Sequence, residues 1–268
     1  MEVRFWGARG SYPASGASFA EFGHHTPCIA VSVGDDLIVL DAGSGAAALG
    51  QHLLQKPVAR LHLLLSHFHH DHVTGLPFLF YGAGEGTAVS IHAVLGADLA
   101  LREIVAGLFS APYFPGDATD WLGRVTFHAH AEGGAFDLGE VAVATAPLAH
   151  PGGSTAFRLT HGGRSLVYAS DVENNVTPDA VLVALASGVD LLIHDTMFTT
   201  EEASAHRGWG HATFDAAVAL GRQAGVRRIA GFHHSPRHDD ATLRRREQEL
   251  AALSPGAFLA REGQTIRL

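Results

Sequence analysis

The chain has 268 residues, of which 47% are hydrophobic and 17% are charged, a composition typical of a soluble globular protein. Its net charge of −9 argues against bulk attraction to nucleic acid, because such binding depends mainly on neutralising phosphates. No window approaches the roughly 18 uninterrupted apolar residues of a membrane span, and residues 1–11 lack the pattern of a signal peptide. We therefore expect a cytoplasmic protein with no membrane partner.

Strand-like runs alternate with helix-like runs along the whole chain. In the first half, we expect strands at 2–6, 28–33, 36–41, 61–66 and 88–94, and helices at 45–55, 73–81 and 97–109. In the second half, we expect strands at 124–130, 141–148, 154–160, 165–170, 189–195 and 227–234, and helices near 178–187, 213–224 and 239–253. This order predicts a mixed α and β chain with layered sheets covered by helices, forming one domain over residues 1–268.

Histidine is unusually frequent, with 19 residues against 18 Lys plus Arg. Cys28 is the only cysteine, so a thiolate-based zinc site is excluded and any metal must be held by His and carboxylates. The histidines are most concentrated at residues 66–72, which read SHFHHDH and follow the apolar run LHLLL. Such a polar loop would be costly to bury without hydrogen-bond partners or a metal.

The spacing within this loop indicates two nearby ligand points. In extended chain His67 and His69 share one face, while Phe68 and His70 point the other way. Asp71 and His72 come where the chain turns toward the next helix, so they reach a second point close to the first.

Other candidate ligands terminate predicted strands elsewhere in the chain. His150, Asp171 and His233 each follow an apolar run, where α/β folds place functional groups. Asp41 also ends a strand, and its carboxylate either caps the loop or orients a metal ligand. A lone histidine in such a place is equally well explained as a capping or surface residue, but the SHFHHDH loop favours a shared metal site.

The succession of HFHHDH, AH, SD and FHHSP resembles the motifs of the metallo-β-lactamase superfamily and covers nearly the whole chain. The resemblance implies an α/β fold, a four-layer αββα sandwich, with a two-metal site along one edge. In that site His67, His69 and His150 would bind one metal, Asp71, His72 and His233 the other, and Asp171 would bridge them. His234 would be a neighbour of the ligands and not a ligand.

These ligand types suit two divalent ions, zinc, manganese or iron. Such a pair lowers the pKa of a bridging water, so the expected chemistry is hydrolysis by a metal-bound hydroxide, with Asp71 among the residues that take part in catalysis. The same resemblance places Asp195 and His211 at positions that the ribonuclease Z branch and related phosphodiesterases use. A His held by a carboxylate can protonate a departing alkoxide. The alternative is that His211 only precedes a helix that Thr213 caps.

The substrate expected from these features is a small or cyclic phosphodiester. The stretches VRFWGARGSYP, LDAGSG and GLFSAPYFP resemble a bacterial subgroup near the phosphoribosyl cyclic phosphate phosphodiesterases. His24 and His25 stand where that family usually has a Gly-Asn pair, so its specificity is not carried over. The segment 98–124 has only Arg102 and Arg124 as basic residues, so we expect a lid, a pocket wall or a homodimer contact and regard nucleic acid as an unlikely partner.

Two alternatives stay open. Thioester or lactone hydrolases of the glyoxalase II type share the whole ligand set. A metal-binding regulatory protein without catalysis is the other alternative, although such a protein is expected to have lost at least one ligand.

Overall fold

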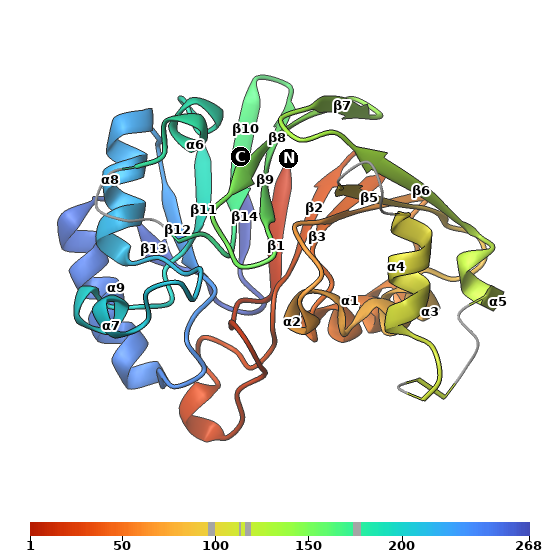
Figure 1. Ribbon diagram of the computed structural model, residues 1–268, viewed down its shortest axis with the longest axis horizontal. Helices are drawn as coiled ribbons and strands as arrows, with labels where there is room; N and C mark the ends of the chain where they lie inside the picture. Colours follow the sequence, from red (N-terminus) through yellow and green to blue (C-terminus); the bar gives the residue numbers. More distant parts are fainter. Residues whose placement is uncertain (96–99, 113, 116–118, 174–177) are drawn as a thin grey trace.

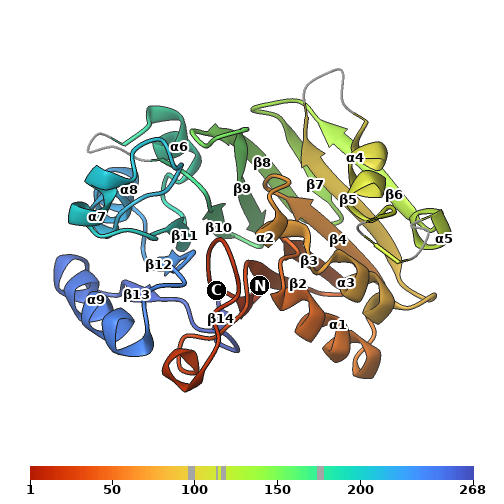
Figure 2. The same ribbon diagram turned by 60° about the horizontal axis from the view of Figure 1, so that its bottom comes forward.

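The computed structural model describes residues 1–95, 100–112, 114–115, 119–173 and 178–268. Two sheets of seven strands each face one another, and helices cover their outer sides (Figures 1 and 2). In spatial order the first sheet contains β14 (Thr265–Arg267), β1 (Glu2–Gly7), β2 (Cys28–Val33), β3 (Asp36–Leu40), β4 (Arg60–Leu65), β5 (Ala88–Val94) and β6 (Val125–His130). The second contains β13 (Phe258–Leu259), β12 (Ile229–Phe232), β11 (Leu191–Asp195), β10 (Arg164–Ala169), β9 (Ser154–His161), β8 (Val141–Leu148) and β7 (Ala135–Leu138).

The helices form the two outer layers of the molecule. On the side of the first sheet lie α1 (Gly45–Gln55), α2 (His70–Val73), α3 (Leu76–Ala83), α4 (Leu101–Leu108) and α5 (Thr119–Leu122). On the side of the second sheet lie α6 (Ala180–Leu185), α7 (Thr200–Ala205), α8 (Phe214–Ala224) and α9 (Asp240–Leu253), and the short 3-10 helix η1 (Ala17–Phe19) lies near α9. No helix in these described ranges is long and apolar enough to cross a bilayer.

The alternation of side chains along the strands separates the hydrophobic core into layers. In β4, Leu61, Leu63 and Leu65 pack under α1 and α3, whereas Leu64 points between the sheets. From the second sheet, Phe157 and its neighbours meet the inward face of the first sheet. Two further apolar clusters join the second sheet to α6, α8 and α9. The predicted αββα sandwich is therefore confirmed.

The predicted strands and helices agree with the structure within a few residues at each end, and short elements account for the differences. The one-turn helix α2 and the four-residue strand β7 have too few residues for a periodic pattern. Helix α7 was also not predicted, although the sequence carries its signal: Thr199 and Glu202 form a capping box, with Glu202 Oε2 accepting from the Thr199 backbone N–H.

The segment 98–124 packs beside α3 in its described part. Leu101, Val105 and Leu122 belong to the apolar cluster under the first sheet, and the ring of Trp121 stacks on Phe80 at 4.6 Å. Residues 98–99, 113 and 116–118 of this segment lie outside the described residues. A lid or dimer-contact role for it stays a prediction.

Candidate metal centre

The candidate site lies where the carboxyl ends of strands from both sheets meet. Strands β3 and β4 are parallel, as are β10, β11 and β12, so the loops after them emerge at common edges. Asp41 follows β3, Asp171 follows β10 and His233 follows β12. Functional groups of open α/β sheets gather at such edges for this reason.

The seven predicted ligands come together in two adjacent groups. Ligand atoms of the first group lie within 4.8 Å of one another, as do those of the second. The first group contains His67, His69, His150 and Asp171, and the second contains Asp71, His72 and His233. His67, His72, Asp171 and His233 are buried, whereas His69 is exposed. The grouping agrees with the division that the family resemblance implied.

Asp171 lies between the two groups and turns one oxygen toward each. Its Oδ2 lies 3.8 Å from Nε2 of His67 and 3.6 Å from Nε2 of His150. Its Oδ1 lies 3.1 Å from Nε2 of His72 and 3.1 Å from Nε2 of His233. This is the arrangement required of a carboxylate that bridges two cations.

The hydrogen bonds of three histidines determine which nitrogen is available to a metal. His150 donates Nδ1–H to the carbonyl of Gly210 at 2.9 Å, and His72 donates Nδ1–H to Asp41 at 2.8 Å. The hydroxyl of Ser66 donates to Asp41, so its oxygen accepts from Nδ1 of His67 at 3.0 Å. In the neutral ring each Nε2 then carries a lone pair, and Nε2 of His67 and His72 are buried without a hydrogen-bond partner.

Lone pairs of these nitrogens face the oxygens of Asp171, so acceptors oppose acceptors. Such an arrangement is repulsive unless a proton or a cation lies between them. The described residues therefore fit divalent metal ions, and imidazole with carboxylate is the donor set of zinc, manganese and iron.

The close packing of imidazoles and carboxylates shifts the pKa values of these groups. Burial alone would lower the pKa of His72, but the carboxylates of Asp171, Asp71 and Asp41 raise it well above its ordinary value. Burial, together with the charge of His72, lowers the pKa of His67 to about 2. Although burial opposes this, the neighbouring imidazoles hold the pKa of Asp71 and of Asp171 below the usual range.

Asp41 is fully buried and accepts hydrogen bonds from the SHFHHDH loop. Besides His72, it accepts from the backbone N–H of Ser66 at 2.7 Å and from the hydroxyl of Tyr168 at 2.6 Å. These contacts support both roles considered for Asp41, because the bond from the Ser66 N–H caps the loop and the bond from His72 orients a candidate metal ligand.

Backbone strain is concentrated at this site. Among the described residues, four that are not glycine have positive φ: Ser11, Asp41, Asp171 and His233. Such residues persist only where the surroundings over-determine them, and they cluster at functional sites. Ser11 was not predicted, and its backbone N–H donates to Oδ2 of Asp71 at 2.8 Å.

The N-terminal loop reaches the site because it pairs with the loop after β12. Gly10 N–H donates to the carbonyl of His234, and His234 N–H donates to that of Ala8, both at 2.9 Å. A Cβ on Gly10 would lie 2.3 Å from Nδ1 of His233, so only glycine allows this approach. No local sequence signal could have shown a contact between segments more than 200 residues apart.

Asp195 and His211 form a pair beside the two groups. Nδ1 of His211 donates to Oδ2 of Asp195 at 2.8 Å, and Asp195 is fully buried. Burial alone would lower the pKa of His211, but the carboxylate of Asp195 outweighs it and raises the pKa to about 9. His211 also belongs with Asp171 and His233 to a third set of ligand atoms within 4.8 Å, so its position suits either a proton donor or a ligand.

The remaining histidines of the motifs belong to neither group. His234 is buried and its Nε2 donates to the carbonyl of Ala260 at 2.8 Å. His24 contacts the carbonyl of Gly16, and His25 lies 3.2 Å from the hydroxyl of Ser44. His70 belongs to neither group, although it and Phe68 line the mouth of the site.

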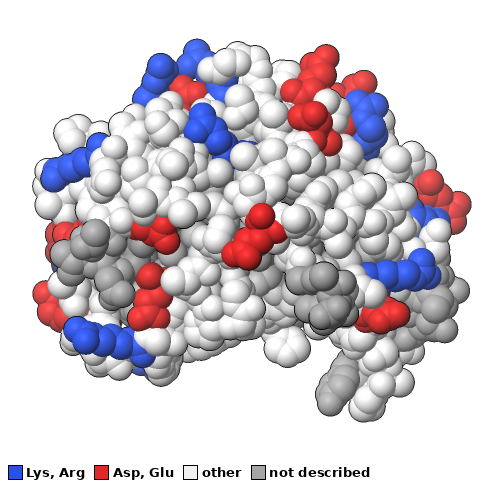
Figure 3. All heavy atoms as spheres, turned by 45° about the horizontal axis from the view of Figure 1, so that its top comes forward, with Lys and Arg blue, Asp and Glu red and all other residues white. Residues whose placement is uncertain are grey.

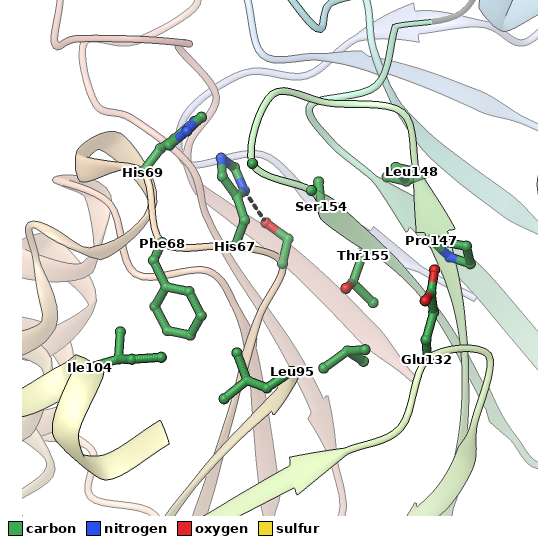
Figure 4. Close-up of a pocket in the computed structure, with 14 residues that line it drawn as sticks. His67, Phe68, His69, Leu95, Ile104, Glu132, Pro147, Leu148, Ser154 and Thr155 are labelled. Atoms are coloured by element: carbon green, nitrogen blue, oxygen red, sulfur yellow. Dashed lines mark hydrogen bonds between the residues drawn. The ribbon is translucent and has the colours of Figure 1, made fainter. Parts of the chain in front are cut away.

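Two spaces adjoin the ligand cluster. One is the mouth itself, about 500 Å³, lined by residues of both groups and by Trp209 and His211. The other, about 510 Å³, begins at His67 and His69 and extends between the sheets. Figure 4 shows its apolar wall, with Phe68, Leu95 and Ile104 on one side and Leu148 across from them, and Glu132 as an acidic lining group. A substrate that reaches the cluster can therefore extend to either side of it.

Comparison with known proteins bears on this arrangement. Residues 37–234 match the family model described as "Beta-lactamase superfamily domain". The ribonuclease Z of Gemmatimonas aurantiaca is 36% identical over 106 residues, which are 40% of this chain and 32% of the relative. This chain thus spans about a third of that relative's length. The ribonuclease Z of Shouchella clausii is 24% identical over 253 residues, covering 75% of this chain and 77% of the relative.

Solved structures share the fold across the full length of the chain. The metallo-β-lactamase fold protein YhfI of Bacillus subtilis superposes with a TM-score of 0.74 at 19% identity, covering 99% of this chain and 98% of the other. Zinc-bound PqqB of Methylobacterium extorquens gives a TM-score of 0.73 at 16% identity, with complete coverage of both chains. At these identities the likeness concerns the fold alone.

These relatives contradict the expectation that nucleic acid is an unlikely partner and that a small molecule alone is the substrate, because their name identifies RNA as what they cleave. The expectation depended on net charge and on the few basic residues at 98–124. On the face shown in Figure 3, basic and acidic side chains are indeed scattered. Net charge, however, describes an average field, whereas contact with a phosphate depends on local cations, including any bound metals.

Proposed function

Because this chain belongs to the beta-lactamase superfamily, we propose that it hydrolyses phosphodiesters with the help of divalent metal ions. The observation that carries the proposal is the pair of Asp195 and His211, joined at 2.8 Å, at the mouth of the seven-ligand cluster. Hydrolysis of a phosphodiester needs a nucleophile, stabilisation of charge on the phosphoryl oxygens and a proton for the leaving oxygen. The cluster and the pair together supply all three.

We assign the ligands as the two groups suggest. His67, His69 and His150 would hold one ion, and Asp71, His72 and His233 would hold the other. Asp171 would serve both sites, because it turns one oxygen toward each group. When bound, such ions acidify a water to make the nucleophile and stabilise negative charge on the attacking and leaving oxygens. Zinc, manganese and iron all match these donors, and zinc is the ion named for the similar PqqB structure.

His211 has the role of proton donor in this proposal. Asp195 accepts from Nδ1 and holds the ring, so Nε2 is the nitrogen left to face a substrate in the mouth. From Nε2 the proton passes to the departing oxygen, and Asp195 acts as a positioning residue that keeps the ring in the correct orientation and tautomer.

RNA is the first substrate class to test, because the relatives that match along the chain are named ribonuclease Z. A small or cyclic phosphodiester is the second, since it would need only the mouth and the adjoining cavity. A thioester and a lactone complete the panel, because enzymes that cleave them share the ligand set.

The experiment compares the wild-type protein with His211→Ala and with a matched control, His161→Ala, at a histidine on β9 that lies outside the cluster. Each protein is purified and reconstituted with zinc or manganese, and its metal content and turnover are measured. We expect phosphodiester turnover to fall by about 10²- to 10⁴-fold in His211→Ala, with unchanged metal content. His161→Ala should match the wild type.

Two results would contradict the proposal. Turnover of only the thioester or the lactone would exclude phosphodiester hydrolysis. Loss of a metal equivalent from His211→Ala would show that this residue is a ligand and not the proton donor.

A further inference from the structure

An aromatic side chain stands exposed at the mouth of the metal centre. Trp209 is 57% exposed and lines the same space as His69, Asp171 and His211. A single exposed apolar residue elsewhere on a surface needs no explanation. Tyr81, at 70% exposed on α3, is such a residue and lines neither space beside the cluster. The position of Trp209 beside the reacting groups is what distinguishes it.

The loop that carries Trp209 is held in place by a carboxylate. Glu173 accepts from the backbone N–H of Gly208 at 2.8 Å and from that of Gly210 at 3.0 Å. One carboxylate therefore binds both residues that flank Trp209. Glu173 follows the bridging Asp171 by two positions. The indole is thereby tied to the loop that bears a candidate metal ligand.

A second contact fixes the loop from the side of the cluster. Gly210 accepts from Nδ1 of His150 through its carbonyl, and a Cβ on Gly210 would lie 2.1 Å from that nitrogen. The backbone next to Trp209 therefore packs directly on a candidate ligand. Its separation from the metal centre cannot vary much.

The indole is supported on one side by other rings. The ring of His206 lies edge-on to Trp209, with 4.8 Å between ring centroids, and stacks on Phe198, with 4.5 Å between centroids. The centroids of Phe198 and His211 are 5.7 Å apart. Since more than half of Trp209 is still exposed, an aromatic surface remains open toward solvent at the mouth.

We propose that Trp209 is a stacking platform for a nucleobase next to the phosphate that is cleaved. This inference rests on the proposed function and narrows its substrate to nucleotide-containing phosphodiesters. Every base has a π-face, so an indole binds it without hydrogen-bond readout of its identity. A tryptophan with two χ angles on a clamped loop also loses little conformational entropy when it stacks.

The test measures binding by calorimetry on the metal-loaded protein, with AMP as the probe and ribose 5-phosphate as its base-free counterpart. The variants are Trp209→Ala, Trp209→Phe and the exposed-aromatic control Tyr81→Ala. We expect Trp209→Ala to weaken AMP binding by about 5- to 100-fold, as for other base–aromatic contacts. Ribose 5-phosphate should bind all four proteins equally, and Trp209→Phe should retain most of the AMP affinity.

Quenching of tryptophan fluorescence gives a second readout of direct contact. AMP should quench the wild type, and Trp209→Phe should lose most of that quenching because the other two fluorophores, Trp6 and Trp121, are buried or half-buried. The platform is overturned if the wild type does not bind AMP, if Trp209→Ala binds it as tightly as the wild type, or if both ligands lose affinity equally.

Turnover of an RNA oligonucleotide by the wild type keeps the two proposals apart. If the wild type cleaves RNA but Trp209→Ala binds AMP as tightly as the wild type, only the stacking proposal is wrong. If AMP binding depends on Trp209 but the wild type cleaves no phosphodiester, only the proposed hydrolysis is wrong.

Discussion

Oδ2 of Asp41 lies 2.8 Å from Nδ1 of His72, and both side chains are fully buried. The carboxylate thereby makes Nδ1 a donor and turns Nε2 toward Asp71 and Asp171, at 3.4 and 3.1 Å. Neither of these contacts is local in sequence to Asp41. Asp41 thus determines which nitrogen of His72 is available to a metal.

Asp41→Asn should weaken metal binding by about 10- to 100-fold, as for other partners that orient a ligating histidine. The amide keeps the size of the side chain but replaces one acceptor oxygen with a donor. Competition with a chromophoric chelator measures the affinity. Asp36→Asn is the matched control, because Asp36 is a mostly buried carboxylate at the opposite end of the same strand, where it pairs with Arg60 and His62. Equal affinity in both variants would contradict the orienting role of Asp41.

Gly210→Ala should disturb the cluster, whereas Gly208→Ala should not. Both glycines have positive φ, 82° and 80°, so the backbone strain of the substitution is similar. Only at Gly210 would the new Cβ meet His150, at 2.1 Å from Nδ1, and nothing lies within 4 Å at Gly208. We expect both variants to lose about 1 to 2 kcal/mol of unfolding free energy from strain, with a further loss and reduced metal content for Gly210→Ala. Urea unfolding and metal analysis check this, and identical behaviour of the pair would argue against it.

Asp195→Asn and His211→Ala should not be additive in their effect on turnover. If Asp195 acts only by holding His211, the double variant should be no slower than His211→Ala alone. The single Asp195→Asn variant should lose part of the activity, because the amide no longer favours the same tautomer. Steady-state rates of the wild type and the three variants on one phosphodiester complete this double-mutant cycle. A double variant slower by the product of the two losses would assign Asp195 a separate role.

A second histidine cluster, away from the metal centre, should make the fold sensitive to acid. His92 on β5 is buried and lies 3.0 Å from His130, and its ring stacks on His128 at 4.6 Å. Burial, followed by repulsion from His128 and His130, lowers the pKa of His92 to about 3. Between this value and the ordinary pKa of about 6.5 the unfolded chain binds a proton that the folded chain does not, so stability falls as the pH falls.

His92→Gln should reduce that pH dependence, since the amide can bond to Ser90 and His130 without titrating. Between pH 7 and 5, the unfolding free energy of the wild type should fall by about 1 to 2 kcal/mol more than that of the variant. His161→Ala, at a partly exposed histidine, should follow the wild type. Parallel pH profiles for wild type and His92→Gln would show that His92 is not responsible.

Much of the fold was predictable because it depends on patterns that repeat along the chain. The strands at 28–33, 61–66 and 141–148 were found from their apolar runs, and their boundaries moved by two residues at most. The one-turn helix α2 and the strand β7 were not found, because four residues carry no period. The expectation that nucleic acid is an unlikely partner was wrong because it depended on net charge. Net charge is a property of the whole chain and says little about the electrostatic field at one cleft.

The seven candidate ligands were named from motif order, and the structure brings all of them together. Their binding of metal stays a prediction until it is measured. Ser11, Glu173 and Trp209 were not named, since each acts through contacts that only folding creates. Ser11 reaches Asp71 across 60 residues, and Glu173 reaches Gly208 and Gly210 across 35 and 37.

The donor chemistry and the layered sheets could be predicted from the residues alone. Nineteen histidines, a single cysteine and carboxylates at strand ends define which metals suit the chain, and residue periodicity predicts layered sheets covered by helices. The αββα order was implied by the family resemblance. Only the tertiary structure decided that Asp171 turns one oxygen to each group, that Asp41 selects the free nitrogen of His72 and that Trp209 stands at the mouth. Donor type is a property of each residue, whereas the distances between donors depend on how two sheets pack and on where their connecting loops meet.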